Sequence, residues 1–150
     1  MSDWRANIIE DDDAIGALLR GVRRIAVLGI KPESRAAKPA HYVPAYLQRA
    51  GFEIVPVPVY YPDVDEILGE RVYRTVAAIP GPVDLVEVFR KPGDIPPHVP
   101  DLIAKRPKAV WFQSGIRNDA AAEALARAGI VVVQDRCLMV EHRRLSGAEA

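Results

Sequence analysis

The sequence predicts a single Rossmann-like, doubly wound α/β domain: a five-stranded, mostly parallel sheet with helices on both faces. Three observations carry this prediction. Strand-like and helix-like segments alternate along the chain, several strand-like segments are continuous β-branched runs, and glycine or proline punctuates most boundaries. A continuous apolar strand is buried on both faces, which is typical of a parallel sheet that helices cover on each side.

Composition indicates one globular domain without a charged macromolecular partner. The chain has 150 residues, 49% apolar and 27% charged, which suits one domain over residues 1–150 with its core at about 22–145. Lys plus Arg and Asp plus Glu both number 20, so the net charge gives no reason to expect nucleic acid or a membrane as partner. No apolar run approaches the roughly 20 residues of a membrane span, and no signal peptide begins at Met1, so we expect a cytoplasmic protein.

The first half of the chain is expected to hold helix 11–23, strand 24–28, helix 40–51 and strand 52–59. Three aspartates begin the first helix, where the helix dipole favours anions. Pro44 is expected within the first turn of the second helix, because an interior proline removes an amide donor. Gly51 then ends that helix.

The second half is expected to hold strand 82–89, helix 96–106, strand 108–114, helix 118–129, strand 130–135 and a terminal helix from about residue 136. Asn118 suits a helix cap and Gly129 a helix stop. Residues 68–79 are expected to form a surface excursion with a short helix. An acidic group before them is expected to start a helix; it consists of Asp63, Asp65 and Glu66.

The long loop after the first strand is the first candidate binding site, because ligands of doubly wound sheets bind at the carboxyl ends of the strands. A dinucleotide fingerprint would follow Gly29 with glycines at the positions of Lys31 and Ser34. The charged residues of this loop are instead Lys31, Glu33, Arg35 and Lys38. An anion would therefore be held by side-chain charge and by the amino end of the next helix, unless the loop is only a solvated basic surface.

The end of the second strand favours an adenosine ligand that is more negative than NAD. An NAD site places Asp or Glu at this point to bind the ribose hydroxyls. Here Val57 and Pro58 lead into two tyrosines, and the next acid lies beyond them. An uncharged pocket of this kind suits an adenine and does not repel a ribose that carries a phosphate.

Several segments together resemble a known family. The segments are "IAVLGIKPESR", "YLQRAGFEIVPV", "LGERVY", "VDLVEVFRKP", "VWFQSGI" and "DRCLMVEH", from about Ile25 to Leu145. In this order and spacing they are similar to the small stand-alone CoA-binding proteins of bacteria and archaea, the YccU-like family. The chain also resembles, more distantly, the CoA-binding domain of the succinyl-CoA synthetase alpha subunit.

The resemblance implies that coenzyme A, or an acyl-CoA, binds across the strand ends. The first loop would wrap the phosphates and part of the adenosine, the second strand would end beside the adenine or ribose, and the fourth strand would border the pantetheine arm. The implied binding residues are Gly29, Ile30, Lys31, Pro32, Glu33, Ser34, Arg35, Lys38, Val57, Pro58, Phe89, Arg90, Gln113, Ser114 and Gly115.

Catalysis is not evident from the sequence. The synthetase uses a histidine in a second domain and a partner subunit, for which this chain has no room. We expect His41 at the surface near the basic loop, His98 exposed among prolines, and His142 in a capping or packing role. The single cysteine and His142 supply at most two metal ligands, where zinc takes three or four. No metal site is therefore expected.

The leading hypothesis is a CoA-binding module that acts by association, with a homodimer or another protein as partner. The alternatives are an NAD(P)-linked oxidoreductase, a subunit of an acyl-CoA ligase completed by a partner, and a regulator that reads the CoA pool.

Cys137, the only cysteine, is a candidate reactive thiol. It follows the last strand at the ligand-binding edge and lies in the first turn of the expected terminal helix, beside Arg136. The helix dipole and the arginine both favour a thiolate, so a mixed disulfide with the thiol of CoA is one hypothesis. A small buried hydrophobe is the other interpretation.

Overall fold

A five-stranded parallel sheet forms the centre of the molecule, in the order β2-β1-β5-β6-β7. The computed structural model describes residues 3–146. The strands are β1 (Arg24–Leu28), β2 (Glu53–Val57), β5 (Leu85–Val88), β6 (Ala109–Phe112) and β7 (Val131–Val133). Each lies within a segment where the sequence predicts a strand, so the predicted doubly wound fold is confirmed.

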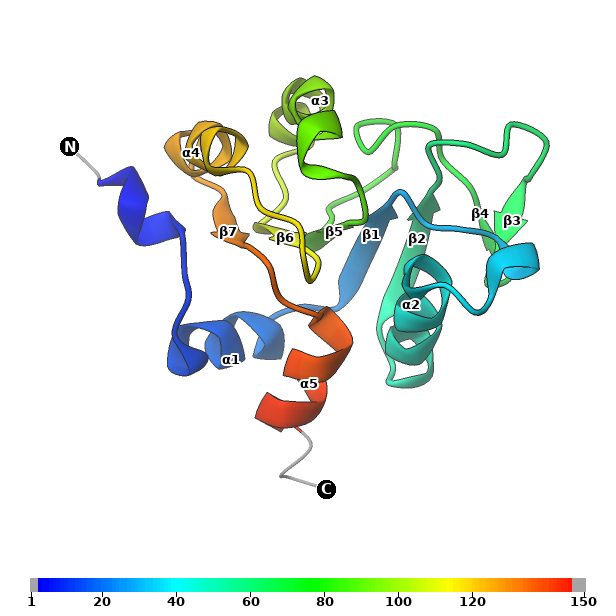
Figure 1. Ribbon diagram of the computed structural model, residues 1–150, viewed down its shortest axis with the longest axis horizontal. Coiled ribbons are helices and arrows are strands. Elements are labelled where there is room, and N and C mark those ends of the chain that lie inside the picture. Colours follow the sequence, from blue (N-terminus) through cyan, green and yellow to red (C-terminus); the bar gives the residue numbers. More distant parts are fainter. Residues whose placement is uncertain (1–2, 147–150) are drawn as a thin grey trace.

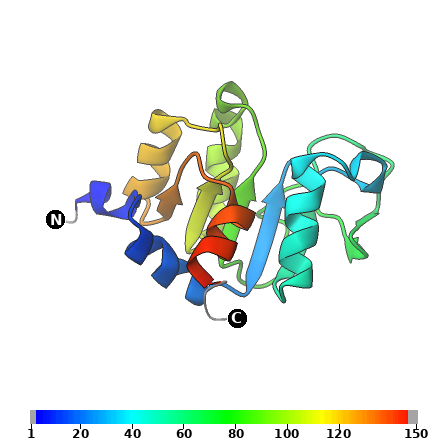
Figure 2. The ribbon, with the colours of Figure 1, turned by 60° about the horizontal axis from the view of Figure 1, so that its bottom comes forward.

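Helices cover both faces of the sheet, as Figure 1 shows. They are α1 (Asp12–Arg20), α2 (Pro39–Arg49), α3 (Val99–Lys105), α4 (Asp119–Arg127) and α5 (Leu138–Ser146). Helices α3 and α4 pack on one face, and α1, α2 and α5 pack on the other. Figure 2 shows α5 between α1 and α2, both of which it contacts. Within residues 3–146, none of the helices has the length and apolar character needed to span a membrane.

The helix caps follow the sequence. The Asp11 carboxylate accepts a hydrogen bond from the Ala14 amide at 3.0 Å, and the Asn118 side chain accepts one from the Ala121 amide at 3.0 Å. Each side chain satisfies an amide that the first turn leaves without a partner. Short 3₁₀ helices complete the chain at Trp4–Asn7, Glu33–Arg35, Pro92–Asp94 and Pro96–His98.

The short helix predicted within residues 68–79 is wrong. The chain there forms an antiparallel hairpin of β3 (Glu66–Ile67) and β4 (Glu70–Arg71), followed by turns. The two turn residues both have positive φ, 56° at Leu68 and 75° at Gly69, which is the backbone that closes a two-residue hairpin. The acidic group before them is therefore not a helix start, since Glu66 belongs to β3.

Pro44 lies deeper in α2 than the sequence predicts. The helix begins at Pro39, so Pro44 is in its second turn, where it deprives the Ala40 carbonyl of its intrahelical donor. The Lys31 amide donates to that carbonyl instead, at 3.1 Å. The proline is tolerated because the loop after β1 satisfies the oxygen that it leaves free.

Candidate functional site

A cavity of about 690 Å³ lies at the carboxyl ends of the strands. It lies at the switch point of the sheet, because the helix after β1 packs on one face and the helix after β5 packs on the other. Its lining includes eight of the site residues expected from the sequence: Lys31, Lys38, Phe89, Arg90, Gln113, Ser114, Gly115 and Cys137. We call this space the strand-end cavity.

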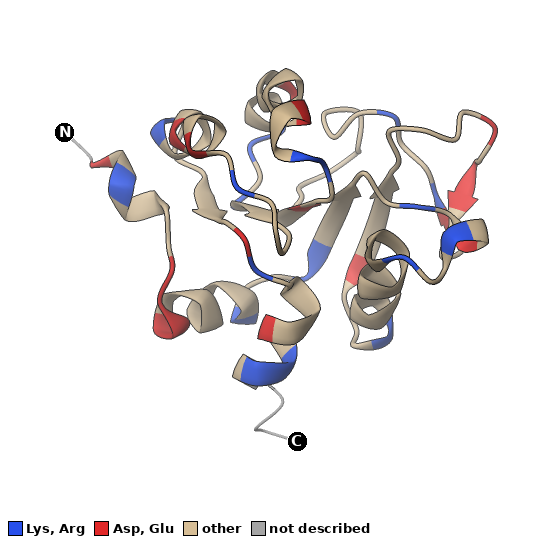
Figure 3. Cartoon of the chain, viewed as in Figure 1, with Lys and Arg blue, Asp and Glu red and all other residues tan. Residues whose placement is uncertain are grey.

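The strand-end cavity is lined by positive charge. Its charged lining residues are Lys31, Lys38, Arg90 and Lys91, and no Asp or Glu lines it. In Figure 3 blue segments mark Lys and Arg on the loops that leave β1 and β5. Because the chain as a whole has a net charge of zero, this concentration of cations favours an anionic ligand here.

Gly29 allows the loops after β1 and β5 to approach each other. Its φ is 89°, and a Cβ at this position would lie 2.3 Å from the Phe89 carbonyl oxygen. Its amide donates to the Val57 carbonyl at 2.8 Å, which joins it to β2 as well. A side chain at residue 29 would therefore force the loop away from the cavity wall.

The first turn of α2 forms hydrogen bonds with both the amide and the carbonyl group of Lys31. The Lys31 amide donates to Ala40, and its carbonyl oxygen lies 2.8 Å from Nδ1 of His41. Since a carbonyl only accepts, His41 Nδ1 carries the proton in this contact. His41 is buried, so its predicted surface position is wrong. These contacts fix the backbone from which the Lys31 side chain enters the strand-end cavity.

Arg90 is fixed against the cavity wall by three side chains. Its Nε donates to Nε2 of His98 at 3.2 Å, its guanidinium lies 5.6 Å from the centre of the Tyr60 ring, and Asp94 lies 3.9 Å away. Burial, and then the charge of Arg90, lower the pKa of His98, so the ring stays neutral and accepts this bond. His98 is half-buried, which corrects its predicted exposure.

The chain beyond the end of β2 contributes aromatic surface next to the strand-end cavity. Val57 and Pro58 are both buried. Beyond them, Val59 and Tyr60 line a small hollow of about 50 Å³, which shares Lys31, Phe89 and Arg90 with the strand-end cavity. Tyr60 is 63% exposed, so its ring is available to a ligand.

The remaining residues of the first loop differ in placement. Ile30 and Pro32 are buried. The Glu33 carboxylate accepts a hydrogen bond from the Leu68 amide at 2.7 Å and so braces the β3–β4 hairpin. Ser34 and Arg35 are exposed on a 3₁₀ turn and lie outside the lining of the strand-end cavity.

The far end of the strand-end cavity is formed by Gln113 and Cys137. The side-chain oxygen of Gln113 accepts from the Leu138 amide at 3.1 Å and thereby caps α5. Cys137 immediately precedes α5, and its carbonyl accepts from the Glu141 amide at 2.9 Å. A second cavity of about 540 Å³ shares Ser114 and Cys137 with the first, so the thiol lies where the two spaces meet.

His142 has the packing role that the sequence predicts. Its Nδ1 lies 2.7 Å from the Tyr46 hydroxyl, and its ring packs edge-on against Tyr46 and Phe52. In the described part of the chain, no group of three or more His, Cys, Asp or Glu side chains is placed to hold a metal ion.

Comparison with known proteins assigns the chain to a family. Residues 23–143 match the CoA binding domain family. The chain belongs to this family. It is 34% identical over 128 residues to the uncharacterized protein YneT of Bacillus subtilis, covering 85% of this chain and 91% of that protein. The solved structure of cell-free ID.343 from Thermus thermophilus is 43% identical, with a TM-score of 0.83 over 91% of this chain and 99% of that one.

A larger protein shares the fold. The dinucleotide-forming acetyl-coenzyme A synthetase 1 of Ca. Korarchaeum cryptofilum is similar over 78% of this chain and 27% of its own, at 21% identity and a TM-score of 0.63. At this identity the similarity establishes the fold only. The family resemblance seen in the sequence is confirmed, and the strand-end cavity is the candidate ligand site of this CoA-binding-domain protein.

Proposed function

We propose that the protein binds coenzyme A or an acyl-CoA in the strand-end cavity. The observation that carries the proposal is the lining of four cations without an acid, at the switch point of a domain of the CoA-binding family. Coenzyme A carries a diphosphate and a ribose phosphate, so it presents several negative charges to these cations. The cavity volume of about 690 Å³ lies in the range of small-molecule sites.

The lining favours one orientation of the ligand. The adenosine end would lie toward the small hollow beside Tyr60, where an adenine can stack on the exposed ring. The phosphates would lie between Lys31, Lys38 and Arg90, close to the amino end of α2. The pantetheine arm would then follow Gln113 toward Cys137.

The proposed role is binding without chemistry of its own, as a cytoplasmic carrier of CoA or as a regulator that acts through a protein partner. The linings of the cavity and of the adjoining hollow offer cations, apolar surface, tyrosine rings and one thiol, but no acid–base pair for hydride or acyl transfer. The NAD(P)-linked alternative is disfavoured because Lys31 stands where a dinucleotide needs a second glycine.

Titration calorimetry with CoA, acetyl-CoA, dephospho-CoA and NAD tests the proposal. We expect CoA and acetyl-CoA to bind more tightly than NAD. Lys31→Ala and Arg90→Ala should each weaken CoA binding by about ten- to a hundredfold, the worth of one charge-assisted hydrogen bond. Arg49→Ala is the matched control, since this exposed cation lies in the last turn of α2, away from the cavity. Tighter binding of NAD, or equal effects of all three substitutions, would overturn the proposal.

A further inference from the structure

Glu87 is an unexplained polar group in the core. Its relative exposure is 0%, and neither carboxyl oxygen has a hydrogen-bond partner. Within the described residues, these two oxygens are the only buried side-chain polar atoms without a partner. Folded proteins satisfy nearly all buried polar groups, so an exception of this kind calls for a cause.

The position of Glu87 in the sheet relates it to the strand-end cavity. It belongs to a row of paired residues that crosses all five strands, Pro56, Val27, Glu87, Trp111 and Val133, and it is the only acid there. Phe89 and Gln113, which directly follow β5 and β6, lie two residues beyond Glu87 and Trp111, about 7 Å at strand spacing, and line the cavity. Side chains two apart on a strand share a face, so Glu87 lies one row beneath the cavity floor.

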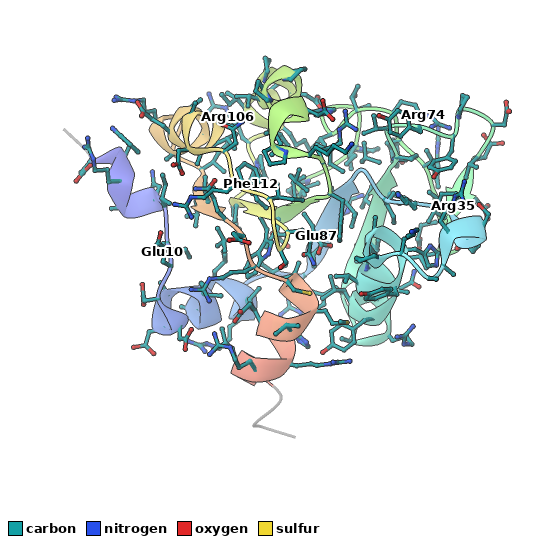
Figure 4. The ribbon with its side chains drawn as sticks, viewed as in Figure 1. Glu10, Arg35, Arg74, Glu87, Arg106 and Phe112 are labelled. Carbon is teal, nitrogen blue, oxygen red and sulfur yellow. The ribbon has the colours of Figure 1, made fainter. Side chains whose placement is uncertain are left out.

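The helices on this face offer Glu87 no partner. In Figure 4 it lies in the interior of the molecule, on the side of the sheet that faces α5. The indole N–H of Trp111 beside it donates to the Arg136 carbonyl at 2.7 Å, and the Gln113 side-chain oxygen accepts from Leu138. The buried polar side chains of the helices on this face are engaged elsewhere as well. His41 bonds the Lys31 carbonyl oxygen, and Glu141 pairs with Arg136 and Arg144.

Burial raises the pKa of Glu87 well above that of a solvated carboxyl. Burial thus favours the protonated form of the side chain, which presents one O–H donor and one carbonyl acceptor. A neutral carboxyl provides no positive charge for a phosphate, which the cations of the strand-end cavity would bind instead. It suits the neutral amides and the thiol of a pantetheine arm.

We propose that Glu87 is a positioning residue for the bound ligand, whose carboxyl forms a hydrogen bond with the thiol-bearing end of the pantetheine arm. This inference rests on the proposed CoA function and extends it. The contact requires the half-buried Phe89 side chain to turn aside, a rotamer change of the kind that binding commonly brings. In the complex the ligand then provides the hydrogen-bond partner that Glu87 lacks in the free protein.

The test compares ligands with and without the arm. CoA and adenosine 3′,5′-bisphosphate are titrated into the wild type, Glu87→Gln and Glu87→Met. Methionine keeps the unbranched length without the polar group, and glutamine keeps a donor and an acceptor. We expect Glu87→Met to weaken CoA binding about two- to tenfold, the worth of one neutral hydrogen bond, and to leave the bisphosphate unchanged. Glu87→Gln should bind both ligands within about twofold of the wild type.

Infrared difference spectroscopy gives a second readout that a structural role would not move. The wild type should show a protonated-carboxyl band that is missing in Glu87→Gln, and CoA but not the bisphosphate should shift it. A band that CoA leaves in place, or equal changes in affinity for both ligands, overturns the inference while the CoA function stands. If the wild type binds neither ligand, the proposed function fails and the inference fails with it.

Discussion

Replacing Glu87 with glutamine should remove a pH dependence from the free energy of unfolding. Burial raises the pKa of this carboxyl above its value of about 4.5 in the unfolded chain. Between these two pKa values the unfolded state has lost the proton and the folded state keeps it. The stability of the wild type therefore falls as the pH rises through this window, and it is highest below the unfolded pKa.

The size of the effect on the free energy of unfolding follows from the one proton that Glu87 retains and from its unpaired oxygens. A single proton that the folded state retains costs at most about 1.4 kcal/mol of stability per pH unit. The two unpaired oxygens lower the free energy of unfolding by about a further 1–3 kcal/mol, because no protein group replaces the hydrogen bonds that they make to water in the unfolded chain. Glu87→Met removes both costs and should raise the midpoint of thermal unfolding by several degrees.

Urea unfolding of the wild type and both variants from about pH 5 to about pH 8 measures this. The gain in stability of Glu87→Gln over the wild type should increase with pH. Glu66→Gln, at an exposed glutamate of the β3–β4 hairpin, is the matched control and should show no such trend. A difference that is independent of pH, or a Met variant less stable than the wild type at neutral pH, would refute the reasoning, since it would mean that the carboxyl is paired or solvated.

Three further predictions address the cavity wall. Gly29→Ala should lower the free energy of unfolding in urea more than Gly129→Ala. The φ values of the two glycines are 89° and 87°, but only a Cβ at residue 29 would meet another backbone segment. Equal losses of stability would contradict the close approach to Phe89. Pro44→Ala should lower CoA affinity about two- to tenfold without lowering the melting temperature, because the restored amide competes with that of Lys31 for its acceptor; unchanged calorimetric affinity would contradict this. CoA disulfide should add one CoA to Cys137, because the thiolate attacks one sulfur of the disulfide and releases the other CoA as a thiol. Intact mass should then show an adduct that a reductant removes and that Cys137→Ser lacks.

The sheet could be predicted because its signal is local. Each strand of the central sheet is a run of mostly apolar residues flanked by turn residues. Burial on both faces requires apolar residues over most of such a run. The β3–β4 hairpin lacks such a signal, since each strand has two residues and half of its side chains face solvent. Its mark in the sequence is the pair Leu68-Gly69, and a leucine with positive φ is too uncommon to be expected there.

The composition of the sequence predicts the basic loop, but the contacts that organise this loop are not local. His41 and the Ala40 carbonyl hold Lys31 only because α2 folds back onto the loop that precedes it. The apparent mismatch of Pro44 with a helix interior is part of the same arrangement. A proline in an otherwise periodic helix can thus indicate a carbonyl that some other segment needs.

Glu87 shows why a side chain that matters can pass unnoticed in a sequence. In "LVEVF" a single acid stands within an otherwise apolar run, and the run does not show what would pair with its side chain. The predicted cover of helices on both faces already makes this position interior, but only the assembled fold shows that no protein group pairs with the carboxyl. Methionine or leucine would fill the same space without this cost, so stability alone does not explain the acid. Its place one row beneath Phe89 and Gln113 relates the cost to the cavity, and binding is the event in which the missing hydrogen bond can form.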